Sequence, residues 1–137
     1  MIRSGTTCYN DMYFAIDEAA ATSSAIGIRA VHGCGVFGFP TSWAAGPVEC
    51  LEKNRAFFNS HSRDDLLMWG IAPHAPYTVP EQYIVAAKEL ARESGVLFHM
   101  HVQESEAELK DSISGTPSSS RHLSEARCSP IEVGLRW

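Results

Sequence analysis

The chain has 137 residues, of which 45% are hydrophobic and 20% charged, a composition typical of a globular protein with one apolar core. Its formal net charge is −5 and its Lys and Arg residues are scattered, so it lacks the basic stripe that neutralises nucleic-acid phosphates. The sequence has no apolar run near the roughly 20 residues that cross a bilayer, and its N-terminus lacks the order of a signal peptide. We therefore expect a cytoplasmic protein that binds neither nucleic acid nor membrane.

Strand-like and helix-like stretches alternate through residues 1–110. Stretches rich in β-branched and aromatic residues predict strands at 6–10, 28–37, 66–72 and 96–102. Apolar residues at helical spacing predict helices at 11–25, 47–60 and 80–94. Asp11 is expected to cap the first helix, while Pro80 and Gly95 mark the two ends of the third. This alternation predicts parallel βαβ units and therefore an α/β fold.

The pattern fails from about Asp111 onward. Residues 112–120 form a low-complexity polar tract, and the residues after it show no sustained period. We expect 111–137 to be an irregular or disordered tail.

The four cysteines lie far apart in the sequence: Cys8, Cys34, Cys50 and Cys128. They form no C-x-x-C pair of the kind found in zinc knuckles and redox sites. We expect free thiols, most of them buried.

Two histidines interrupt the apolar fourth strand. Side chains two residues apart on a strand point to the same face, so His99 and His101 are expected to project together, while Met100 and Val102 face the helices. Two imidazoles in an apolar strand need partners, and a divalent cation is one. A pair of hydrogen-bonded core histidines is the other, and the spacing alone leaves both open.

Glu104 follows the carboxyl end of this strand, where the ligand sites of parallel α/β sheets gather. A carboxylate there can pass protons between water and a substrate. Alternatively, Glu104 is a solvated residue that opens the next helix. Glu106 and Glu108 are interpreted in that second way, as an acidic run that favours a helix N-terminus.

A further histidine, His74, follows the third strand and lies between two prolines that restrict the backbone. Its place at a strand's carboxyl end suits contact with a substrate, although hydrogen bonds within its own loop would also explain it. His32 is a weaker candidate because it sits within a strand, where burial alone accounts for it.

The glycines of Gly33-Cys34-Gly35 predict that another group approaches the backbone closely at the end of the second strand. A phosphate-binding loop would lead into a helix N-terminus. This segment runs toward Gly38-Phe39-Pro40 instead, so we rank a phosphate-binding domain last.

Three segments together resemble the amidohydrolase superfamily: residues 4–13 (SGTTCYNDMY), 73–78 (PHAPYT) and 99–105 (HMHVQES). Their order and separation are similar to those of the branch of metal-dependent aminohydrolases and chlorohydrolases that includes methylthioadenosine and S-adenosylhomocysteine deaminases. The resemblance covers about residues 1–110 and implies a partial (β/α)8 TIM barrel that holds about strands two to five.

The resemblance also implies roles for the candidate residues. His101 matches a metal ligand, Glu104 a catalytic proton shuttle, and His74 a substrate-binding residue. His99 matches a neighbour in the second shell that is usually not a ligand. The implied reaction is hydrolysis of a carbon–nitrogen bond other than a peptide bond, namely zinc-dependent deamination of a purine-type or related small heterocyclic substrate.

The chain departs from the family pattern in its ligand set. The first-strand H-x-H pair, the sixth-strand histidine and the eighth-strand aspartate have no match here, which leaves His101 as one ligand where zinc takes three or four. We expect a fragment, and two functions stay open for the isolated chain. One is part of a hydrolase, and the other is an inactive α/β fragment or interaction module that self-associates through exposed barrel edges.

Overall fold

Four parallel strands follow one another across one sheet in chain order in the computed structural model, which describes residues 1–61 and 65–114. The strands are β1 (Cys8–Tyr13), β2 (Arg29–Val36), β3 (Leu67–Pro73) and β4 (Leu97–Phe98). One register row joins Met12, Gly33, Gly70 and Leu97 across all four. Parallel strands in sequential order need crossover connections, and right-handed crossovers place their helices on one face.

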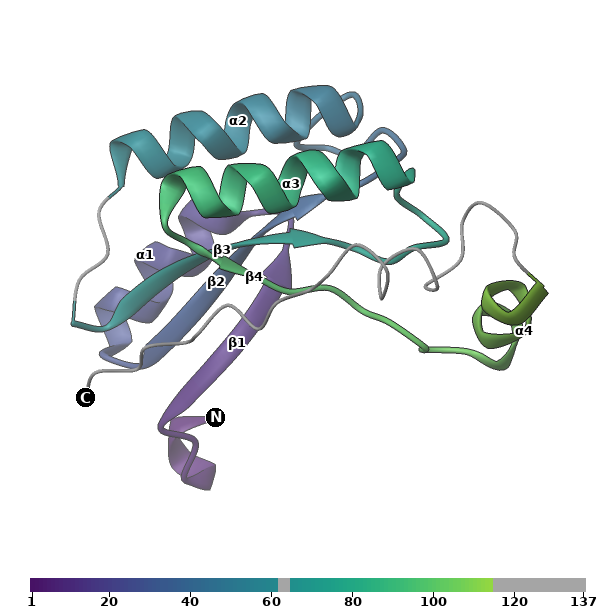
Figure 1. Ribbon diagram of the computed structural model, residues 1–137. Helices are drawn as coiled ribbons and strands as arrows, with labels where there is room; N and C mark the ends of the chain where they lie inside the picture. Colours follow the sequence, from purple (N-terminus) through teal and green to yellow (C-terminus); the bar gives the residue numbers. More distant parts are fainter. Residues whose placement is uncertain (62–64, 115–137) are drawn as a thin grey trace.

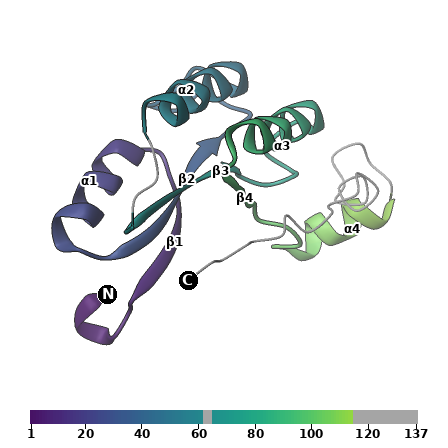
Figure 2. The same ribbon diagram turned by 60° about the vertical axis from the view of Figure 1, so that its left-hand side comes forward.

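Three helices make these crossovers, and Figures 1 and 2 show them on the same side of the sheet. They are α1 (Ile16–Ile26), α2 (Pro47–Ser60) and α3 (Glu81–Ser94). A short 3-10 turn, η1 (Ile2–Ser4), precedes β1, and α4 (Glu106–Ser114) stands apart from the sheet beyond the end of β4 (Figure 1). The described part of the chain places no helix on the opposite, concave face, where barrel sites form.

The apolar core fills the space between the sheet and these three helices. Alternate residues of β2 and β3 face it, including the fully buried Val36 and Ile71. A second cluster joins α1 to the first halves of the strands through Ile16, Ala30 and Trp69. This packed side of the sheet also holds the buried His32, whose ring is hydrogen-bonded to Ser23 of α1.

The predicted helix cap at Asp11 is wrong. Strand β1 continues through Tyr13, and α1 begins at Ile16 with Ala15 at its N-cap. Asp11 is a register partner of His32, and its carboxylate lies 3.9 Å from Nδ1 of that buried ring. The backbone pairing of β1 with β2 therefore includes Asp11, which lies within the sheet rather than at a helix start.

The fourth strand is shorter than its predicted span of 96–102. Regular pairing ends at Phe98, although the His99 amide still donates to the Ile71 carbonyl at 3.2 Å. In a parallel ladder the next hydrogen bond would come from residue 73 of β3, and Pro73 has no N–H to donate. The chain nevertheless stays beside β3, because the His101 amide donates to the His74 carbonyl at 3.0 Å.

Helix α4 continues to Ser114, so residues 111–114 of the predicted irregular tail are helical. Residues 115–137, and Cys128 with them, lie outside the described residues, and the domain boundary at 110 stays a prediction. Within the described ranges, no helix has the length and apolar character needed to cross a membrane.

The cysteines of the described ranges are free, as expected. Cys34 and Cys50 are buried, and burial raises the pKa of both thiols, so they stay protonated. Cys8 is exposed on β1.

Candidate active site

The His99 ring lies across the concave face of the sheet, over a pair of glycines. Gly33 of β2 and Gly70 of β3 are register partners. A Cβ atom at Gly33 would lie 2.6 Å from Cε1 of His99, and one at Gly70 would lie 3.7 Å from its Nδ1. The imidazole therefore occupies space that a side chain at Gly33 would otherwise fill, whereas it is at ordinary van der Waals distance from a Cβ atom at Gly70. This explains the close approach that the sequence predicts at Gly33.

The described residues leave the buried Nε2 of His99 without a hydrogen-bond partner. Burial lowers the pKa of His99 and the neighbouring His101 lowers it further, while the carbonyl and the charge of Asp11 raise it less. We therefore expect a neutral imidazole near pH 7.

His99 and His101 share one face, as predicted. Both line a hollow of about 250 Å³ together with residues 10–12 of β1. Met100 packs against the helix-side core, but Val102 is half exposed rather than turned to the helices. The two imidazoles, which follow the end of β4, thus both lie on the concave side of the sheet.

His74 and His101 meet at the carboxyl edge of the sheet. Their ring centroids are 5.5 Å apart, and the rings lie nearly perpendicular. Nδ1 of His74 is joined to the Thr78 hydroxyl at 2.9 Å, so the hydrogen bond within its own loop is present as well. That bond fixes the ring through one nitrogen and leaves its other edge toward the site.

Glu104 reaches the same edge through a residue of the His74 loop. Its side chain is exposed, and Oε2 accepts a hydrogen bond from the hydroxyl of Tyr77 at 2.5 Å. The Tyr77 ring in turn packs edge-on against His74, with centroids 6.0 Å apart. All three candidates, His74, His101 and Glu104, are therefore linked at one end of the sheet.

Glu108 lies in the first turn of α4, as expected of an acidic run at a helix N-terminus, but it is not solvated. Only 4% of this residue is exposed, and its carboxylate accepts the backbone N–H groups of Gln103 and Glu104 at 2.9 and 2.8 Å. Glu106 fits the interpretation, since it is exposed and pairs with Lys110. The spacing of Ser105 and Glu108 is a capping-box pattern, a signal that could have identified Glu108 from the sequence.

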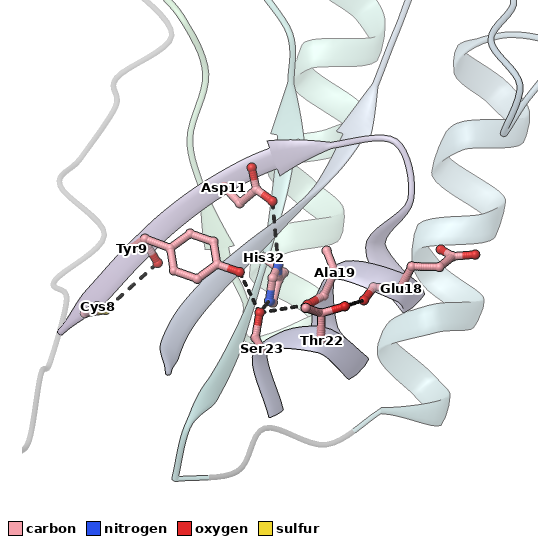
Figure 3. A network of polar contacts seen from close by, with 8 residues as sticks. All are labelled: Cys8, Tyr9, Asp11, Glu18, Ala19, Thr22, Ser23 and His32. Carbon is pink, nitrogen blue, oxygen red and sulfur yellow. Dashed lines mark hydrogen bonds and ion pairs between the residues drawn. The ribbon is translucent and has the colours of Figure 1, made fainter. Parts of the chain in front are cut away.

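A network of polar contacts joins β1, β2 and α1 on the helix side of the sheet (Figure 3). The Ser23 hydroxyl donates to the Ala19 carbonyl at 2.7 Å, and it is joined to the Tyr9 hydroxyl at 2.5 Å and to Nε2 of His32 at 3.0 Å. Because Ser23 has one proton to give, Tyr9 and His32 donate to it. His32 is 1% exposed and faces Asp11 through its other nitrogen.

This network predicts how stability depends on pH. Burial lowers the pKa of His32, and the attraction of Asp11 opposes the shift more weakly. A group whose folded pKa is below its unfolded value of about 6.5 takes up a proton more readily on unfolding. The free energy of unfolding should therefore fall as the pH is lowered below about 6.5.

Urea denaturation between pH 7.5 and 5 measures this dependence. A His32→Gln variant should lose less stability over the same range than the parent chain, because its side chain at this position does not titrate. Equal losses in the two proteins would show that His32 is not the responsible group.

The described residues alone do not fit a complete zinc site. Residues 1–61 and 65–114 contain no group of three His, Cys, Asp or Glu side chains that could hold a metal ion. Zinc takes three or four protein ligands, whereas the described residues offer only the neighbouring imidazoles of His101 and His74. We therefore derive no reaction step through a metal from these residues.

Comparison with known proteins identifies the family. Residues 1–133 match the amidohydrolase family, and the chain belongs to it. The chain is 39% identical over 111 residues to a 5-methylthioadenosine/S-adenosylhomocysteine deaminase of Thermodesulfovibrio yellowstonii, a match that covers 81% of the chain and 25% of that protein. It is 36% identical over 110 residues to a 5'-deoxyadenosine deaminase of Methanopyrus kandleri, with 80% and 25% covered. The chain thus spans about a quarter of the length of these relatives.

Solved structures confirm the predicted partial barrel. An adenosine deaminase from Xanthomonas campestris with bound zinc superposes with a TM-score of 0.83 at 31% identity, over 91% of this chain and 28% of that one. An atrazine chlorohydrolase from Arthrobacter aurescens shares the fold at 18% identity, with a TM-score of 0.72 over 90% and 32% of the two chains.

Proposed function

We propose that this chain supplies part of the active site of a metal-dependent hydrolase that deaminates a purine-type or related heterocyclic substrate. The observation that carries the proposal is the junction of Glu104, His74 and His101 at the carboxyl edge of a parallel sheet. The relatives named as deaminases of methylthioadenosine and deoxyadenosine support the substrate class. A cytoplasmic location stays a prediction from the sequence.

Three side chains would act on the substrate. Glu104 would take a proton from the attacking water and deliver it to the leaving amine, so that water adds to the ring carbon and ammonia leaves. His74, fixed by Thr78, would hold and polarise the reacting group. His101 would be the one metal ligand of this chain, and a bound divalent metal would make hydroxide available near neutral pH.

A catalytically inactive module is the second candidate, and the open sheet favours it. β1 and β4 lie at the two ends of the strand order, so each leaves one backbone edge without a strand partner within the described sheet. Unpaired edges of this kind template association with another chain. This candidate predicts no stoichiometric metal, no ammonia release and self-association.

One experiment separates the two. The 137-residue chain is purified with zinc, its metal content is determined, and ammonia release is assayed with adenosine-type and guanine-type substrates. Stoichiometric metal with ammonia release supports the hydrolase. If the chain holds no metal and releases no ammonia, and light scattering shows concentration-dependent dimers, the hydrolase function is overturned for the isolated chain.

The two histidines of residues 99–101 should differ in metal binding. His101→Gln should abolish zinc retention, whereas His99→Gln should weaken it less, since the His99 ring lies over the glycines rather than beside His74. Isothermal titration with zinc measures both variants under the same conditions. Equal loss in the two would place His99 among the ligands.

A further inference from the structure

The backbone bends sharply just before Glu104. Gln103 has φ 56°, and it is the one residue other than glycine with a positive φ among those that the structure describes. This left-handed conformation is unfavourable for a residue with a Cβ atom and persists only where surrounding contacts hold it. This bend immediately precedes Glu104 and so helps to set the direction of its side chain.

The contacts that hold this bend come from Glu108. Its two carboxylate oxygens accept consecutive backbone amides, Oε1 from Gln103 at 2.9 Å and Oε2 from Glu104 at 2.8 Å. Both are charge-assisted hydrogen bonds to a nearly buried carboxylate. The Ser105 hydroxyl fixes Glu108 by accepting its backbone N–H at 3.2 Å.

This arrangement goes beyond an ordinary capping box. In that motif the glutamate at the third helical position accepts the backbone N–H of the N-cap residue, here Ser105. The amides that Glu108 accepts belong instead to residues 103 and 104, which precede that N-cap. Glu106, in the same first turn, is 80% exposed and binds Lys110.

The carboxylate of Glu104 is held from a second direction. The Tyr77 hydroxyl donates a hydrogen bond to Oε2 of Glu104, with 2.5 Å between the two oxygens. Tyr77 belongs to the loop that also carries His74. This hydrogen bond is the largest cause of the raised pKa of the Tyr77 phenol. The backbone of Glu104 is therefore fixed by Glu108 and its side chain by Tyr77.

We propose that Glu108 and Tyr77 are positioning residues for Glu104, Glu108 through the left-handed turn at Gln103 and Tyr77 through the carboxylate. The consequence for catalysis rests on the proposed function. The turn at Gln103 and the hydrogen bonds to Glu104 do not rest on the proposed function. They are therefore tested by measurements that need no enzyme activity.

The first test compares Glu108→Gln with Glu106→Gln in the full chain. Both remove one charge from the first turn of α4. Glu108→Gln also puts an NH2 donor in place of one of the two oxygens, which would face a backbone N–H that it cannot accept. Amide exchange of Gln103 and Glu104 should rise about tenfold or more in Glu108→Gln and change less than about twofold in Glu106→Gln. The buried amide of Ala30 in the inner strand β2, bonded to the Leu66 carbonyl at 2.9 Å, reports any loss of global stability.

Unchanged exchange in Glu108→Gln, or an equal rise in both variants, would overturn the role of Glu108. A rise that the Ala30 amide matches would do the same, because it would show general destabilisation in place of a local turn.

The second test keeps the fold and removes one contact. Tyr77 is half exposed, so Tyr77→Phe should leave the unfolding midpoint close to that of the parent. In a chain that keeps Tyr77, Glu104→Gln should lower the pKa of the Tyr77 phenol toward its ordinary value. NMR of the ring carbon that bears the hydroxyl measures this pKa. No shift would exclude the contact.

In the active protein, Tyr77→Phe should lower kcat about tenfold with KM changed less than about twofold, because a misdirected Glu104 affects the transition state more than binding. A change in KM alone would overturn positioning by Tyr77. If neither metal nor ammonia release is found, the proposed function fails, while the exchange and phenol measurements still decide the positioning of Glu104.

Discussion

Glu104→Gln should lower the rate of ammonia release about 10²–10⁴-fold in the metal-loaded protein that contains this chain, the range expected for loss of a general acid–base group. The amide keeps an oxygen that accepts the Tyr77 hydroxyl, so the side chain should stay in place while losing its capacity to carry a proton. The expected signature is therefore a fall in kcat with little change in KM. Steady-state kinetics with an adenosine-type substrate measures it.

Glu106→Gln is the matched control for this variant. It removes the same charge two residues away, from a side chain that is 80% exposed and bound to Lys110. We expect its kcat to stay close to that of the parent. An equal fall in both variants would attribute the effect to the acidic run as a whole, and full activity in Glu104→Gln would remove Glu104 from the reaction.

Gly33→Ala should destabilise the chain by about 3 kcal/mol, at the upper end of the usual cost of overpacking. The new methyl group would lie 2.6 Å from Cε1 of His99 and 2.7 Å from the Asp11 carbonyl oxygen. The ring has to leave its place over the glycines, and the backbone of β1 has to move as well. Urea denaturation and the NMR shifts of the His99 ring measure the two consequences.

Gly46→Ala serves as the control for this substitution. A Cβ atom at Gly46 meets nothing within 4 Å, and its extended backbone suits any residue. We expect the free energy of unfolding to change by less than about 1 kcal/mol, from helix capping alone. A comparable loss at both positions would show that the cost at Gly33 is not steric.

Local signals predicted α2 and α3 well because the ends of these helices are determined by nearby residues. α2 spans the predicted 47–60, with Pro47 at its start. α3 ends before Gly95, which adopts the left-handed backbone that closes a helix and that glycine takes without steric cost. The other errors come from long-range pairing. β1 pairs with β2 through Tyr13, where a helix was predicted, and β4 lacks its next hydrogen bond because its neighbour has Pro73 there. Neither partner is visible in a short window of sequence.

Some residues of the candidate site could be predicted from the sequence, and others could not. His74, His99, His101 and Glu104 stood out because polar groups at strand ends need partners. The residues that hold Glu104 did not stand out in the sequence. Tyr77 lies 27 positions from Glu104, and only the folded chain brings the two side chains into contact. Glu108 was hidden in an acidic run, although its spacing from Ser105 was a usable signal.

The contact of Gly33 with the His99 ring changes how natural variation in this protein should be interpreted. A substitution at Gly33 would ordinarily be classed as a scaffold change, since the residue carries no functional group. Because the His99 ring rests in the space that a side chain at Gly33 would fill, such a variant displaces a histidine that lines the hollow beside His101. Surveys of loss-of-function alleles should therefore count this backbone position with the reactive residues.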